Sequence, residues 1–233
     1  MQGANLSGVD LKDCDFKNKN LQETNFEGAN LENVDFNYSN LTNANLSNAN
    51  LKNIKFKKAK LQGANLSGVD LKGYDFKEKN LSRTNFEAAN LENVNFSYTN
   101  LKSARLSHAN LNKAKFYRAN LENSNLTGTK LNNADLSYTN LREANLKQIE
   151  AIEAKFYQAN LVLANLSRAN LIGADLENAR LDRANLTESD LMGANLNKTN
   201  LWRANLLGAN LFGVDLNAVL FMDTIMPNGT VYK

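Results

Sequence analysis

The side chains that most often carry out chemistry in proteins are scarce or scattered in this sequence of 233 residues. It has one histidine, His108, and one cysteine, Cys14. A single thiol excludes an internal disulfide and a metal site built from several thiolates. Acidic residues are spread along the whole chain with no third group placed to tune them, and no glycine-rich phosphate loop is present. We therefore expect no catalytic residues, no cofactor and no metal, and predict that the protein is not an enzyme.

Composition and charge are those of an ordinary soluble chain. The 27 Lys and Arg residues exceed the 24 Asp and Glu residues by a net charge of +3, and 42% of the residues are apolar. The N-terminal residues lack the apolar core of a signal peptide. No apolar run approaches the ~18 residues that a membrane span needs. These observations predict a cytoplasmic protein with no membrane association.

The dominant feature of the sequence is a period of five residues. Leu or Phe occupies every fifth position from Leu6 to Phe221, except at Ala151. A small residue, usually Ala, stands two positions before each, and usually Asn or Asp stands one position before. Neither an α-helix nor a flat strand would place residues five apart on one side. These leucines share one interior only if the backbone turns a corner within every five-residue unit, so we expect short strands joined by corners.

Two longer periods indicate how many sides each coil has. Phe replaces Leu at intervals of 20, at Phe16, Phe36, Phe56, Phe76, Phe96 and Phe116. Residues 1–60 also align without gaps to residues 61–120, with 40 identical positions. We therefore predict an all-β fold, a right-handed quadrilateral parallel β-helix (a solenoid) of about 11 coils of 20 residues. Residues 1–223 form the solenoid, and residues 224–233 form a C-terminal capping tail.

The repeating units, among them ANLSG, ANLEN, ADLSY and VDLKG, resemble the pentapeptide-repeat protein family over about residues 2–223. Residues 224–230 are similar to the tail of cyanobacterial members. The resemblance implies the same quadrilateral β-helix. It also implies one characterised activity, imitation of DNA by strongly acidic members that bind type II topoisomerases such as gyrase. The slight positive charge of this chain and its uninterrupted repeats argue against that role, which we keep as an alternative.

Three residues do not suit the inward positions that they occupy. The period places Lys19, Tyr74 and Lys79 in slots that are small elsewhere. We expect their side chains to escape at a corner or to pack poorly.

The side of the solenoid that carries the phenylalanines is rich in lysine and tyrosine on its outer surface. This candidate basic and aromatic face contains Lys55, Lys57, Lys58, Tyr98, Lys115, Tyr117 and Arg118. Such a strip could bind an acidic protein or nucleic acid through charge contacts. We favour an acidic protein over nucleic acid, which we keep as an alternative, because aspartates dilute the positive charge.

Apolar residues replace polar ones at outward positions near the C-terminus. The candidate partner interface contains Ile152, Ile172, Met192 and Phe212, which fall one above another, and Trp202 on a neighbouring side. Stacked, exposed apolar side chains of this size are typical of an interface, unless the tail covers them. We expect the N-terminal end to be uncapped, which makes it a second candidate for self-association. We predict a non-catalytic binding or scaffold protein with a protein partner, or a homodimer formed through an end or through the apolar strip.

Overall fold

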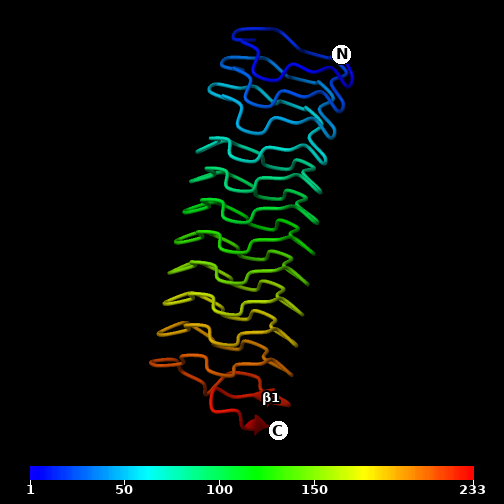
Figure 1. Cartoon of the computed structure of the whole chain (residues 1–233). Coiled ribbons are helices and arrows are strands. Elements are labelled where there is room, and N and C mark those ends of the chain that lie inside the picture. Colours follow the sequence, from blue (N-terminus) through cyan, green and yellow to red (C-terminus); the bar gives the residue numbers. More distant parts are fainter.

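The computed structural model describes residues 1–233 as a rod of stacked coils (Figure 1). Parallel bridges join residues 20 apart along the rod, such as Asn5 with Asn25 and Asn85 with Arg105, as the phenylalanine spacing predicts. The chain contains no helix. Its two named strands, β1 (Thr224–Ile225) and β2 (Val231–Tyr232), pair antiparallel at the C-terminal end. We name the four faces A to D; they carry Leu6, Leu11, Phe16 and Leu21, respectively, and every twentieth residue after each.

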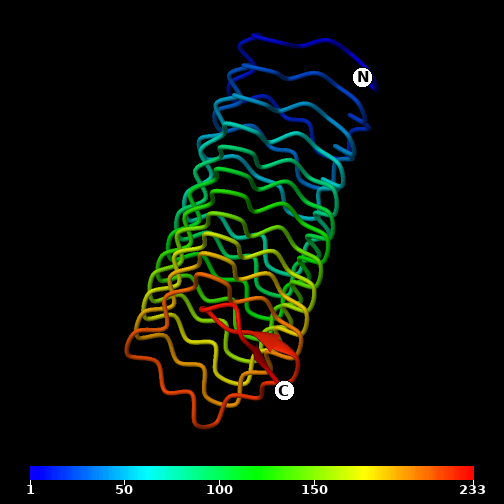
Figure 2. The ribbon, with the colours of Figure 1, turned by 60° about the horizontal axis from the view of Figure 1, so that its bottom comes forward.

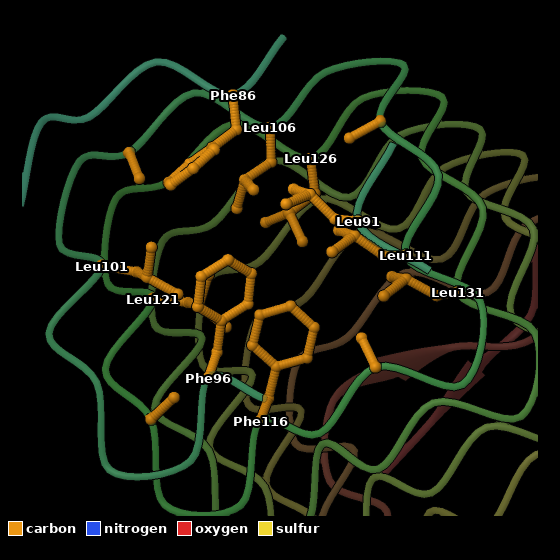
Figure 3. Packing of buried hydrophobic residues seen from close by; sticks show 14 of the residues in the cluster. Phe86, Leu91, Phe96, Leu101, Leu106, Leu111, Phe116, Leu121, Leu126 and Leu131 are labelled. Carbon is orange, nitrogen blue, oxygen red and sulfur yellow. The ribbon is translucent and has the colours of Figure 1, made fainter. Parts of the chain in front are cut away.

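The leucines and phenylalanines at the centres of the units point inward and fill the rod (Figure 3). Leu106, in the middle, has no exposed surface. On face C the Phe96 ring stacks between Phe76, at 5.5 Å, and Phe116, at 5.3 Å between ring centroids. Such dense packing of apolar side chains supplies the main favourable free energy of folding.

Each corner is a four-residue turn whose third residue has a left-handed backbone. At one corner the Thr99 N–H donates to the Phe96 carbonyl at 3.1 Å, and Tyr98 between them has a φ of 60°. A positive φ at this position is the mark of a type II turn. The same conformation recurs at the third residue of the other turns along the rod. Asn and Gly are frequent at this position because they adopt a positive φ with little strain.

The asparagine before each centre explains much of the repeat. Its Oδ1 accepts the N–H two residues later, as Asn65 does from Ser67 at 3.2 Å. Its Nδ2 donates to the asparagine one coil earlier, as Asn65 does to Asn45 at 3.0 Å. Asn85 in turn donates to Asn65 at 2.9 Å. An aspartate can accept but cannot donate, so only asparagine continues this ladder in both directions.

Substituting Asn65→Asp is therefore expected to lower the free energy of unfolding by about 1 kcal/mol, because one side-chain hydrogen bond between coils is lost. The acceptor contacts to Ser67 and Asn85 stay in place. Urea denaturation measures the change. Asn228→Asp in the tail is the matched control, because Asn228 accepts from Thr230 but donates to no other coil. An equal loss in both variants would contradict the role of the ladder.

Threonines in the small inward slots tie neighbouring coils together. The Thr99 hydroxyl donates to the Phe76 carbonyl at 3.0 Å, 23 residues earlier. Thr84 donates to the Leu61 carbonyl in the same way, also at 3.0 Å. Each of these buried hydroxyls thus has a hydrogen-bond acceptor in the preceding coil, as buried polar groups in proteins generally do.

The backbone ladder is interrupted between the third and fourth coils. On face A the coils remain joined, since Leu46 donates to Asn65 at 2.7 Å. On faces B, C and D no backbone hydrogen bond links residues 49–61 to residues 69–80, although such bonds join the coils on either side. The wider spacing is visible in the cyan region of Figure 1. We call residues 49–61 the upper lip and residues 69–80 the lower lip of this split.

Tyr74 and Lys79 hold the lips apart, which differs from the expected escape at a corner. The Tyr74 ring lies between Phe56, at 5.9 Å, and Phe76, at 4.6 Å between centroids. Its hydroxyl accepts the Phe56 N–H at 3.0 Å. The Lys79 ammonium donates to the Phe56 carbonyl at 2.8 Å, again 23 residues earlier. Lys79 therefore makes the same type of hydrogen bond as the inward threonines, but with a longer side chain. Both side chains occupy the space that backbone pairing fills elsewhere.

The tandem similarity of residues 1–60 and 61–120 accounts for this split. Tyr74 aligns with Cys14, and Lys79 aligns with Lys19. Cys14 and Lys19 lie in the first coil, where no coil packs above them; Lys19 is exposed and Cys14 is half-buried. The fourth coil therefore repeats the sequence of an end coil in the interior of the rod.

The two ends differ. At the N-terminal end Leu6 and Leu11 are half-buried and Val9 is exposed. At the C-terminal end the ladder continues into β1, where Ile225 bridges Asn205, and β2 folds back across the end (Figure 2). The Tyr232 ring lies 5.0 Å from Phe221 between centroids. The hairpin thus covers part of the last coil.

Candidate functional surfaces

Exposed apolar side chains collect around the C-terminal end. Ile152 and Ile172 are half-buried, whereas Met192 is 39% and Phe212 is 78% exposed. All four lie at the same position of face B, one coil apart, so they form a row. The tail lies on face A, where the Gly208 N–H donates to the Pro227 carbonyl at 3.0 Å. It therefore leaves Phe212 uncovered.

Trp202 is not part of this row. It is 41% exposed and precedes Phe212 by ten residues, which is half of a 20-residue coil. Other exposed apolar side chains lie on faces A and D of the last coil. We define the C-terminal collar as Met192, Trp202, Leu207, Phe212, Leu220 and Met222. The apolar surface is thus a collar over faces A, B and D at the end of the rod, as well as a row along face B, and face C carries none of its residues.

The tyrosines of face C form a continuous ladder. The Tyr117 ring lies 5.7 Å from Tyr98 and 5.3 Å from Tyr138, edge to face, and Tyr138 lies 5.6 Å from Tyr157. The Arg118 guanidinium lies over Tyr117 at 5.5 Å and over Tyr138 at 5.6 Å. Partial burial, followed by the neighbouring tyrosines, raises the pKa of Tyr138 above its usual value. The four rings form a packed, continuous surface along face C.

Three lysines of the predicted basic and aromatic face lie apart from this tyrosine ladder. Lys55, Lys57 and Lys58 lie on the upper lip of the split. Lys55 pairs with Asp35 at 3.9 Å, and the Lys58 ammonium lies 5.7 Å from the Tyr38 ring centroid. Lys57 has no carboxylate within 4 Å. Lys115 is exposed on the coil that also holds Tyr117. The predicted face is therefore two surfaces, a lysine cluster and a tyrosine ladder.

The split opens into two adjoining cavities that share Ile54 and Tyr74 in their walls. The cavity on face B has a volume of about 650 Å³, and the cavity on face C about 480 Å³. Both volumes lie in the range of ligand-binding pockets, ~300–1,000 Å³. Burial lowers the pKa of the Lys79 ammonium and raises the pKa of the Tyr74 phenol. The sequence identifies both residues as misfits but does not show that they would open the rod.

The groups most often used in catalysis do not converge. His108 is exposed at a corner of face A, and no three His, Cys, Asp or Glu side chains are grouped to hold a metal ion. No helix is present that is long and apolar enough to pass through a bilayer.

Comparisons with solved structures identify similar rods. HetL, a pentapeptide-repeat protein involved in heterocyst differentiation regulation in the cyanobacterium Nostoc sp. strain PCC 7120, is 29% identical, with a TM-score of 0.66 over 97% of this chain and 92% of that one. A pentapeptide-repeat protein of the Arabidopsis thaliana thylakoid lumen is 35% identical over 40% of this chain and 65% of that one, with a TM-score of 0.39. QnrB1, a plasmid-mediated fluoroquinolone resistance protein, is 15% identical over 68% of this chain and 94% of that one, with a TM-score of 0.34.

Family models cover most of the chain. The pentapeptide repeat region model matches residues 1–66 and 59–136, and the model of pentapeptide repeats in eight copies matches residues 152–188 and 189–226. No curated protein matches the sequence. The five-residue period, the bridges between residues 20 apart and these matches agree: the chain belongs to the pentapeptide-repeat family.

Proposed function

We propose that this chain is a non-catalytic, protein-binding scaffold of the cytoplasm, a right-handed quadrilateral β-helix of about 11 coils that docks a protein partner at its C-terminal collar. The observation that carries the proposal is the exposure of Phe212, which is 78% accessible while the C-terminal tail pairs with face A. Contiguous exposed apolar surface is uncommon on monomeric proteins and is typical of interaction sites. The likeness to HetL, which is involved in regulating heterocyst differentiation, is consistent with a binding role.

The residue types of the collar and the rigidity of the rod are those of a protein interface. Phe212, Met192 and Trp202 are of the types that most often anchor protein contacts, large aromatic residues and methionine. The rod beneath them is rigid, because every coil from the fifth to the ninth pairs with both neighbours. A rigid surface loses little conformational entropy on binding.

The test is the double substitution Phe212→Asp and Met192→Asp. Both side chains are exposed, so folding should be unchanged while association weakens by about tenfold or more. Multi-angle light scattering measures self-association, and affinity capture from the native cell extract compares partners of the two forms. Asn112→Asp with Asn132→Asp is the matched control, since it adds the same charges to the same row and keeps both acceptor oxygens, which receive the Asn132 and Ile152 N–H groups. Equal association of all three forms would reject the collar as an interface.

Two other functions remain as alternatives. The tyrosine ladder with Arg118 and the nearby Lys115 favours an acidic partner on face C, and reversing these two charges should abolish that contact. Binding to gyrase as a DNA mimic is less favoured, because the net charge of +3 is opposite to that of DNA. A supercoiling assay with added protein tests it directly.

A further inference from the structure

We propose that the split between the third and fourth coils binds an extended acidic segment of a partner protein, which adds one strand between the lips. This site is distinct from the collar. The inference extends the proposed protein-binding function to a second surface, and its test uses other residues, so either can fail alone.

The lips present the hydrogen-bonding groups of two open strand edges. On the upper lip the N–H groups of Leu51 and Asn53 have no partner. On the lower lip the carbonyls of Asp70 and Lys72 have none. In the neighbouring coils the equivalent groups are paired, as in the bond of 2.9 Å from Leu31 to Asn50. Unpaired strand edges are the surfaces to which an extended peptide adds in β-augmentation.

Face B is the open part of the split. Tyr74 and Lys79 already bond to the backbone of Phe56, so they plug the region around that residue on face C. On face B no side chain bridges the lips, and the 650 Å³ cavity is bounded there by Leu51, Asn53 and Gly73. A peptide backbone inserted there could bond both lips at once. The intact ladder on face A would act as the hinge.

The charge around the split selects an acidic segment. The cavity on face B contributes two lysines and the cavity on face C five, against one aspartate in each, and four of these lysines also pair with carboxylates outside the cavities. The other three, Lys57, Lys58 and Lys79, have no carboxylate within 4 Å and leave positive charge at the split without an acidic partner. Carboxylates at alternate positions of an added strand would reach the lysines at the rim. A nucleic acid would satisfy the charge but lacks the peptide N–H and C=O groups that the lips would pair with.

A fluorescein-labelled, end-capped peptide of alternating Glu and Val, seven residues long, is the probe for the intact protein, with alternating Lys and Val as its control. Fluorescence anisotropy should show saturable binding of the acidic peptide only. In hydrogen exchange followed by NMR, the Leu51 and Asn53 amides should exchange fast in the free protein and slowly in the complex. The Leu91 and Asn93 amides, which donate to Asn110 and Asn112, should be protected in both.

Two pairs of substitutions separate the parts of the proposal. Tyr74→Val with Lys79→Thr installs the residues found one coil later, at Val94 and Thr99. A threonine in this slot can still donate to the preceding coil, so the split should close, the Leu51 amide should become protected without peptide, and binding should weaken by about tenfold or more. Lys57→Glu with Lys58→Glu should weaken binding to a similar extent while the split stays open.

Reversal of two distant exposed lysines, Lys147→Glu with Lys198→Glu, is the matched control and should leave binding unchanged. The proposal is overturned if the acidic peptide does not bind, or if it binds the charge-reversed lip variant as tightly as the original protein. Peptide binding without slower exchange at Leu51 and Asn53 would also overturn it. If single-stranded DNA displaced the peptide and hydrogen exchange at these two amides did not change, the site would be assigned to nucleic acid instead.

Discussion

Replacing Leu106 with lysine is expected to lower the free energy of unfolding by ~3–5 kcal/mol, because it buries a charge with no partner. Leu106 is fully buried at the centre of face A, between Phe86 and Leu126 of the adjacent coils (Figure 3). Lys79 shows how the rod tolerates an inward lysine, since its ammonium reaches a carbonyl only where the coils separate. Around Leu106 the backbone hydrogen bonds between coils are complete on both sides. The Leu106 N–H donates to the Asn125 carbonyl, and the Phe86 N–H donates to the Arg105 carbonyl, both at 2.7 Å.

Urea denaturation followed by circular dichroism measures this effect. Leu106→Met is the control, and its loss should stay below ~1.5 kcal/mol, because the volume is nearly conserved and no charge is buried. A lysine variant with an unchanged melting temperature would show that the leucines do not point into a shared interior.

The second large effect is expected for Phe96→Ala, a loss of ~3–5 kcal/mol from the cavity left in the stack. Phe96 contacts three aromatic rings, Phe76 at 5.5 Å, Phe86 at 5.6 Å and Phe116 at 5.3 Å between centroids. The ring is fully buried, so its removal loses contacts on several sides. Denaturation in urea again measures the change.

Phe96→Leu is the informative control for this site. Leu136, two coils further along face C, shows that the slot accepts leucine. The leucine variant should therefore be closer to the original protein than the alanine variant. If alanine and leucine had equal effects, the phenylalanine stack would contribute no packing of its own.

The repeat made most of the fold predictable. Leucine at one position in five and phenylalanine at one in twenty determine the corners and the length of the coil, and the bridges between residues 20 apart agree with both. The asparagine ladder was not predicted. Its side chains bond across 20 residues, as from Asn65 to Asn45, and this partner is apparent only when the coils are stacked.

The surfaces were predictable only in part. The period places Ile152, Ile172, Met192 and Phe212 in one row and Trp202 on another side, but it does not show that Ile152 and Ile172 are half-buried while Phe212 is 78% exposed. The split could not be derived from the period, because the sequence marks Tyr74 and Lys79 as too large for their slots without showing how the backbone responds. The outcome depends on the hydrogen bonds that both make to Phe56.

The backbone completes one coil every 20 residues, and this length determines which side chains share a surface. One distance tests it. Ser103 and Arg183 are exposed, lie on face D and are 80 residues apart, with four consecutive bridged steps between their strands, from Asn100 to Arg180. Spin labels on Ser103→Cys and Arg183→Cys, in a Cys14→Ala background, should give a narrow pulsed-EPR distance of about 19 Å, four strand spacings. A distance beyond ~30 Å, or no defined peak, would contradict a lap of 20 residues and the surfaces derived from it.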